Sequence, residues 1–143
     1  MNEIDLKGRC AVITGGAAGI GLATAQRMAA SGARVALWDR DQAAAEAALK
    51  SLSGTGHLAV ALDVSSESGV AAATQRTDGS FGAIDILVCS AGITGPNRTV
   101  ADYGFDDWRQ VFPLQRKCAG GDGGSRFFLG FFGKRQVARH TDD

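Results

Sequence analysis

Residues that commonly bind metals or form disulfides are scarce in this sequence. It has two histidines and three cysteines, and neither His57 nor His140 has a partner at ligand spacing. Cys10, Cys89 and Cys118 are odd in number and far apart, which suits neither a disulfide framework nor a zinc pattern. Cys10 and Cys89 lie in apolar runs, where a thiol is expected to pack as a small hydrophobic group. We therefore expect no metal site and a reducing, cytoplasmic compartment.

Excess charge and long apolar runs are also missing. Lys plus Arg number 15 and Asp plus Glu number 15, so the formal net charge is zero. This balance offers no electrostatic footprint for nucleic acid or an anionic membrane. No uncharged apolar run reaches the roughly 18 residues of a transmembrane helix, and the first residues lack the apolar core of a signal peptide. We expect a soluble protein that binds neither nucleic acid nor membrane.

A glycine-rich stretch follows the first apolar run. Gly15, Gly19 and Gly21 have the spacing G-x-x-x-G-x-G and stand between a strand pattern and a helix pattern. Gly15 allows a tight turn with φ > 0, Gly19 lets backbone N–H groups approach a pyrophosphate, and Gly21 lets the helix pack closely on the strand. The positive end of the helix would face the anion. The stretch is typical of a dinucleotide site.

An acidic residue closes the next apolar run. Asp39 follows the glycines at about the 20-residue spacing of the dinucleotide fingerprint. A glycine motif alone is weak evidence, but its context favours this interpretation over a simple glycine-rich turn.

Four strand patterns alternate with three helix patterns. The expected strands cover 9–14, 35–38, 58–62 and 84–88, and the expected helices cover 20–31, 42–52 and 66–77, with Asp41 and Ser65 as N-caps of the second and third. This alternation predicts an α/β fold: a Rossmann-type doubly wound parallel sheet with strand order 3-2-1-4 that is incomplete because later strands are missing. The strand ends carry the Gly15 turn, Asp39, Asp63 and the Ala91-Gly92 turn at one edge.

The sequence changes character after about residue 112. A polar loop over 93–101 precedes an amphipathic helix in which Trp108 is expected to pack in the core. Beyond Phe112 neither helical nor strand periodicity is sustained, and the charged ending is typical of disorder. We expect a dinucleotide-binding domain over 1–112 and an irregular tail over 113–143.

The residues from Leu6 to Phe112 resemble the short-chain dehydrogenase/reductase family. Thr14 to Gly21 matches the motif T-G-x-x-x-G-x-G, and Asp39 matches the acidic residue of members that prefer NAD. Asp63-Val64 resembles the pair that contacts adenine, and Ser90-Ala91-Gly92 resembles the turn after the fourth strand. The resemblance implies a cofactor site at Gly15, Ala18, Gly19, Ile20, Gly21, Asp39, Arg40, Asp63, Val64, Ser90, Ala91 and Gly92.

The resemblance stops short of the catalytic residues. Cys89 stands where asparagine is common, and the active-site asparagine of the family would fall at Gln115. The later serine and the Tyr-x-x-x-Lys pair have no counterpart, because Tyr103 is the one tyrosine and Asp107 stands four positions after it. We therefore assign no catalytic residue. In the family the tyrosine transfers the proton and the lysine tunes its pKa.

These features imply hydride transfer between NAD and an alcohol or ketone as the parent reaction, with NAD preferred over NADP because of Asp39. The alternative is a catalytically inactive nucleotide-binding fragment, and a methyltransferase is a third class. Three explanations of the tail after Phe112 stay open: a reading-frame error, a truncation, or a genuine segment of the protein. Oligomerisation is doubtful for this chain, and the fourth strand, left at an open edge, predicts a marginal, aggregation-prone species.

Overall fold

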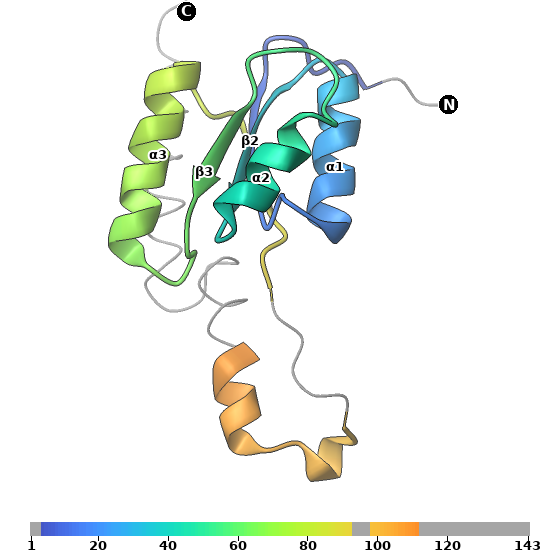
Figure 1. Cartoon of the computed structure of the whole chain (residues 1–143), viewed down its shortest axis with the longest axis vertical. Coiled ribbons are helices and arrows are strands. Elements are labelled where there is room, and N and C mark those ends of the chain that lie inside the picture. The colour runs from blue at the N-terminus through green and yellow to red at the C-terminus, as the bar shows by residue number, and fades with distance from the viewer. Residues whose placement is uncertain (1–3, 93–97, 112–143) are drawn as a thin grey trace, which may run out of the picture. The chain divides into compact units, whose positions relative to one another are not determined.

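The computed structural model describes residues 4–92 and 98–111, so the predictions for the tail after residue 111 lie outside it (Figure 1). The chain divides into two compact units, Met1–Ala91 and Gly92–Asp143. The expected boundary after residue 112 stays a prediction.

The first unit is built on a four-stranded parallel sheet. Its strands are β1 (Cys10–Thr14), β2 (Arg34–Asp39), β3 (Leu58–Ala61) and β4 (Ile86–Cys89). They follow the order β3-β2-β1-β4, and every neighbouring pair is parallel. The continuous apolar composition of β1 and β2 explains their place in the middle, because central parallel strands are covered on both faces. The predicted fold class and strand order are confirmed.

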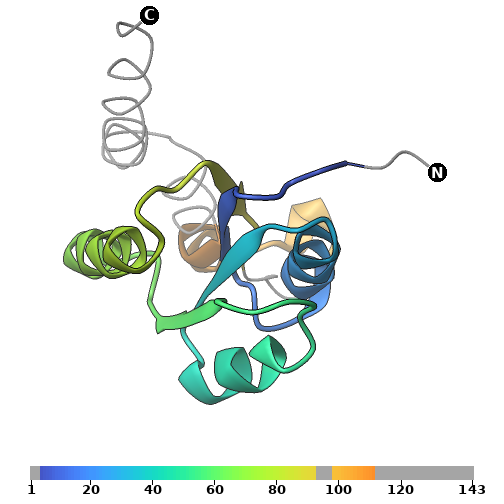
Figure 2. The same cartoon turned by 90° about the horizontal axis from the view of Figure 1, so that it is seen from above.

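Helices cover both faces of this sheet (Figure 2). They are α1 (Gly19–Ala30), α2 (Gln42–Leu49) and α3 (Glu67–Phe81). α1 and α2 pack on one face, where their alanines meet Ile13, Val35 and Leu37 in a buried cluster. α3 lies on the opposite face, and its buried Thr77 hydroxyl accepts a hydrogen bond from the Trp38 indole N–H at 3.1 Å. Small helix residues allow this close packing of helix on sheet.

The ends of α3 differ from the expectation. Ser66 caps the helix and accepts a hydrogen bond from the Gly69 N–H, whereas Ser65 donates its N–H and hydroxyl to Asp63 and belongs to the preceding turn. The helix also continues through Asp78-Gly79 to Phe81. The Phe81 side chain is buried and anchors the last turn, and the helix ends at a glycine with positive φ. Other element ends lie within three residues of those expected.

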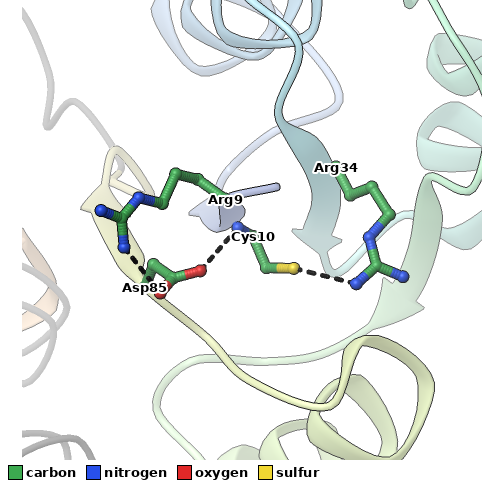
Figure 3. A network of polar contacts seen from close by, with 4 residues as sticks. All are labelled: Arg9, Cys10, Arg34 and Asp85. Carbon is green, nitrogen blue, oxygen red and sulfur yellow. Dashed lines mark hydrogen bonds and ion pairs between the residues drawn. The ribbon is translucent and has the colours of Figure 1, made fainter. Parts of the chain in front are cut away.

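A polar network holds β4 at the amino end of the sheet (Figure 3). The Asp85 carboxylate accepts a hydrogen bond from the Cys10 backbone N–H at 2.9 Å, and the Arg9 guanidinium lies 3.4 Å from the same carboxylate. Arg34 donates to the Phe81 carbonyl at 2.8 Å and contacts the Cys10 sulfur at 3.3 Å. The contacts of Asp85 hold the start of β4 against β1, and those of Arg34 join β2 to β1 and to the end of α3.

Strand β4 is less well covered than the other strands. Within the described residues it pairs with β1 alone, and its apolar residues are half-buried. Cys10 is buried as expected, but the expectation that Cys89 packs as a small hydrophobic group is wrong, because Cys89 is exposed at the end of this edge strand. The expectation of an aggregation-prone edge stays a prediction.

The second unit contains a short 3-10 helix, η1 (Val100–Asp102), and helical residues 105–111. The expectation of a helix in this region is confirmed. Trp108 does not have the full burial expected of a core residue, since it is 40% exposed. Its ring meets Tyr103 edge to face, with the ring centroids 5.4 Å apart. In the described part of the chain, no helix has the length and apolar character needed to cross a membrane.

Candidate functional site

The glycine-rich turn joins β1 to α1 at the carboxyl edge of the sheet. Gly15 has φ +64° and Gly19 has φ +54°, conformations that other residues rarely adopt. The backbone N–H groups of Gly15 and Gly16 both donate to the Trp38 carbonyl, at 2.7 and 3.4 Å. The turn is therefore attached to the end of β2 as well as to β1.

The space around two of the three motif glycines explains why a side chain is absent there. A Cβ built on Gly15 would lie 2.8 Å from the Ala91 Cα, and one built on Gly21 would lie 2.2 Å from the Gly15 carbonyl oxygen. A Cβ on Gly19 would meet nothing within 4 Å. Gly15 and Gly21 are thus required by internal packing, whereas Gly19 borders open space into which a ligand can come. We expected Gly21 to face the strand, but the atoms nearest to its Cβ position belong to Gly15 and Gly16 of the glycine turn.

Among the described residues, no N-cap side chain hydrogen-bonds to the amides in the first turn of α1. Its N-cap, Ala18, provides no side-chain hydrogen bond, and the first turn contains no acidic residue. Ala18, Gly19 and Ile20 are exposed, Ile20 to 81%. Helix N-termini carry unpaired N–H groups and a partial positive charge, so this end suits an anion. Together with the open space at Gly19, it fits a pyrophosphate.

Asp39 ends β2 beside this turn. One carboxylate oxygen accepts a hydrogen bond from the Ala17 N–H at 3.1 Å, and the other accepts from the Asp41 N–H at 3.1 Å. The side chain is partly exposed, so its remaining lone pairs are open to a further donor. Arg40, the next residue, is exposed. The contact between Asp39 and Ala17 has no signal in the sequence, because it depends on how far the turn folds back toward β2.

Thr14 joins the turn after β4 to the end of β1. Its buried hydroxyl oxygen accepts hydrogen bonds from the backbone N–H groups of Ser90 and Ala91, each at 3.1 Å. The sequence motif contains Thr14, but this role follows from the structure alone. Gly92 is exposed and is the first residue of the second unit.

Asp63 and Val64 follow β3 at the same edge. The Leu62 N–H donates to the Asp39 carbonyl at 2.9 Å, which brings the ends of β2 and β3 together. Asp63 is exposed and holds Ser65, whereas the Val64 side chain is buried at 8% exposure. Val64 therefore anchors this loop in the core, and Asp63 is the member of the pair that faces solvent.

The carboxyl edge thus gathers the predicted residues of the first unit, from Gly15 to Ala91, around the ends of all four strands. It combines an anion site at α1 with a carboxylate able to accept from hydroxyl groups. Among the described residues no group of three or more His, Cys, Asp or Glu could hold a metal ion. A helix N-terminus next to a partly exposed carboxylate offers donors for a phosphate and an acceptor for hydroxyl groups.

A concave region lies between α1, the residues before β1 and the start of β4. This apolar groove has a volume of about 530 Å³, and Ile4, Leu6, Ile20, Met28 and Ile86 are among its lining residues. Its lining is mainly aliphatic, and it lacks the turn of free amides that a pyrophosphate needs. The carboxyl edge is the better candidate site for that reason.

Comparison with known proteins places this arrangement in a family. A family model described as short chain dehydrogenase matches residues 9–117. The chain is 44% identical over 107 residues to 2-dehydro-3-deoxy-L-rhamnonate dehydrogenase (NAD(+)) of Sphingomonas sp. (strain SKA58), covering 75% of this chain and 42% of that protein. It is 36% identical over 110 residues to the NADP-dependent (R)-specific alcohol dehydrogenase of Lentilactobacillus kefiri, covering 76% of this chain and 43% of that protein.

A solved structure gives the same picture. The 3-ketoacyl-(acyl-carrier-protein) reductase from Brucella melitensis complexed with NADH superposes with a TM-score of 0.82 and 31% identity, over 96% of this chain and 55% of that chain. The chain thus spans about half the length of the proteins it matches. The residues matched by the family model include the glycine turn and the ends of the strands that follow it. Because the family model matches most of this chain, the chain belongs to the short chain dehydrogenase family.

Proposed function

We propose that this chain binds NAD(H) at the carboxyl edge of its sheet, as the cofactor-binding part of an oxidoreductase that transfers hydride between NAD and an alcohol or ketone. The observation that carries the proposal is the pairing of Asp39 with a glycine turn that is open at Gly19. The family membership supports a nucleotide cofactor and a small-molecule substrate. It leaves no support for the methyltransferase interpretation.

Different residues of the first unit would bind different parts of the dinucleotide. The amides of Gly19 and Ile20 at the start of α1 would hold the pyrophosphate, and Asp39 would accept hydrogen bonds from the adenosine ribose. Asp63 and the turn at Ser90 and Ala91 border the same edge. The nicotinamide supplies the hydride chemistry when it is bound, and the role of these protein groups is to bind and orient.

We propose that NAD is preferred over NADP. The 2′-phosphate of NADP would approach the Asp39 carboxylate, and two like charges about 4 Å apart repel by about 1 kcal/mol in water and by more near a protein surface. Exposed Arg40 could pair with that phosphate, but an exposed ion pair contributes only about 0–1 kcal/mol. The name of the Sphingomonas relative and the NADH in the Brucella structure agree with NAD, whereas the Lentilactobacillus relative is named for NADP.

A second candidate function is nucleotide binding without turnover. The observation that favours it is the sequence around Tyr103, where Asp107 stands in place of the lysine that would complete a Tyr-x-x-x-Lys pair. The Tyr103 ring packs against Trp108. In the family that lysine places a positive charge beside the tyrosine for general acid–base work, and Asp107 has the opposite charge. This chain would then bind the cofactor and leave the substrate unchanged.

Calorimetry with NAD and NADP tests the proposal, using Gly19→Trp and a matched control. Gly19 and Gly82 both have positive φ and both border open space, but Gly82 lies at the end of α3. Both variants thus place a tryptophan at a positive φ beside open space, and only one blocks the proposed pyrophosphate position. We expect NAD binding to be lost in Gly19→Trp and retained in Gly82→Trp. Tighter binding of NADP than NAD, or equal binding by both variants, would contradict the proposal.

A further inference from the structure

The glycine turn is attached to the end of β2 by three consecutive amides. The Trp38 carbonyl accepts from Gly15 and Gly16, and the Asp39 carboxylate accepts from Ala17 at 3.1 Å. The first two contacts use main-chain atoms alone, so no side chain takes part in them. The third depends on the side chain of Asp39. It is also the contact nearest along the chain to the amides that would face the pyrophosphate.

Apart from the packing of the Ala17 side chain on the buried cluster, the described residues give little side-chain support to the backbone between Ala17 and the start of α1. Ala18 is extended, with φ −152° and ψ 170°, and offers no side-chain cap to the helix. Gly19 follows at once with φ +54° and has open space beside it. A glycine in such a position has many accessible conformations, so a fixed point two residues earlier restricts where its N–H group can lie.

We propose that Asp39 is a positioning residue for the pyrophosphate site, in addition to its proposed contact with the adenosine ribose. Its carboxylate holds Ala17 and thereby keeps the Gly19 and Ile20 amides aimed at the pyrophosphate. The inference rests on the proposed function, because the anion in question is that of NAD. The inference adds that the Asp39 side chain acts on two parts of the cofactor. It would contact the adenosine ribose directly, and it would position the pyrophosphate indirectly through the glycine turn.

For removal of the Asp39 carboxylate, the proposal and simple electrostatics predict opposite changes in pyrophosphate affinity. A carboxylate near an anion site repels the anion, so removal of the Asp39 charge alone should leave pyrophosphate binding unchanged or make it tighter. A positioning role predicts weaker binding after the same substitution, because the free turn must be ordered when the anion binds. Inorganic pyrophosphate separates the two effects, since it has no ribose for Asp39 to contact.

The experiment compares the unchanged chain with Asp39→Ala and Asp39→Asn. The Asn side chain keeps one carbonyl oxygen for one of the two N–H donors, whereas Ala keeps none. Glu46→Gln serves as the control, because it removes one negative charge from an exposed position on the neighbouring helix α2. Each protein is titrated with inorganic pyrophosphate and, separately, with NAD, while backbone amide shifts are followed by NMR. Hydrogen exchange of the Ala17 amide is measured without ligand.

We expect the pyrophosphate dissociation constant to rise about tenfold in Asp39→Ala, as the loss of a hydrogen bond to a charged group implies. The rise should be smaller in Asp39→Asn and absent in Glu46→Gln. Exchange of the Ala17 amide should accelerate in both Asp39 variants. Unchanged or tighter pyrophosphate binding in Asp39→Ala would overturn the inference, even if NAD binding falls. If the unchanged chain bound neither pyrophosphate nor NAD, the proposed function itself would fail.

Discussion

Replacement of Gly21 by alanine tests the role of the glycine turn, because two physical effects predict opposite changes in the free energy of unfolding. Gly21 lies in the first turn of α1 with an ordinary helical φ, so helix propensity alone predicts that Ala stabilises the fold by about 1 kcal/mol. The added Cβ would lie 2.2 Å from the Gly15 carbonyl oxygen and 3.3 Å from the Gly16 Cα. Both neighbours are backbone atoms, so no side-chain rotation relieves the contact.

The steric effect should win at this position. The distance to the Gly15 oxygen must grow to at least 3.0 Å, which pushes the turn away from α1. Overpacking of this kind costs about 1–3 kcal/mol, and the backbone origin of the clash favours the upper part of that range. After subtraction of the propensity gain, we expect Gly21→Ala to lose about 1–2 kcal/mol of unfolding free energy. NAD binding should weaken as well, because the turn that moves is the proposed pyrophosphate site.

Gly79→Ala is the matched control for this measurement. Gly79 lies within α3, and a Cβ there would meet nothing within 4 Å. We expect Gly79→Ala to stabilise the fold by about 0.5–1 kcal/mol, since only helix propensity acts. Urea unfolding followed by circular dichroism measures both variants against the unchanged chain. If Gly21→Ala were as stable as Gly79→Ala and still bound NAD, the steric account of the turn would be refuted.

Three further substitutions or assays test other parts of the account. Thr14→Val keeps the shape of the buried side chain but removes the oxygen that accepts hydrogen bonds from two N–H groups of the turn after β4. It should lower the free energy of unfolding by about 1–3 kcal/mol, and an unchanged urea midpoint would contradict this. His57→Leu leaves the Val35 N–H without its acceptor, and it should cost about 1–3 kcal/mol and speed exchange of that amide; unchanged exchange would show that another group replaces the imidazole. The chain should reduce no NAD with a panel of secondary alcohols, and turnover that disappears in Gly19→Trp would show that proton transfer uses another residue.

The fold could be predicted because its signals are local in the sequence. The strands of a parallel sheet read as continuous apolar runs, and right-handed crossovers leave few possible orders for them. The conformation of Gly15 could also be predicted, since a tight turn between a strand and a helix favours positive φ there, whereas the positive φ of Gly19 was not predicted. Asp41 caps α2 as its sequence pattern indicates, and its carboxylate accepts from the Ala44 N–H.

The contacts that shape the site could not be predicted, because they join residues far apart in sequence. The bond from Ala17 to Asp39 and the bonds from Ser90 and Ala91 to Thr14 depend on the distances between strand ends. The sequence contains each polar group but not its partner. Cys89 was misjudged for a related reason, since an apolar run does not show whether its last residue lies under a helix or at an open edge.

The most direct test of the central claim is a map of backbone amide shifts on addition of NAD to the unchanged chain. The account predicts that the largest shifts occur in residues 15–21 and at Asp39, the residues around the start of α1 and the end of β2. Residues at the opposite end of the sheet, such as Cys10 and Asp85, should shift little. Shifts concentrated at that opposite end or at the groove residues Leu6, Met28 and Ile86, or no shifts at saturating NAD, would contradict the account.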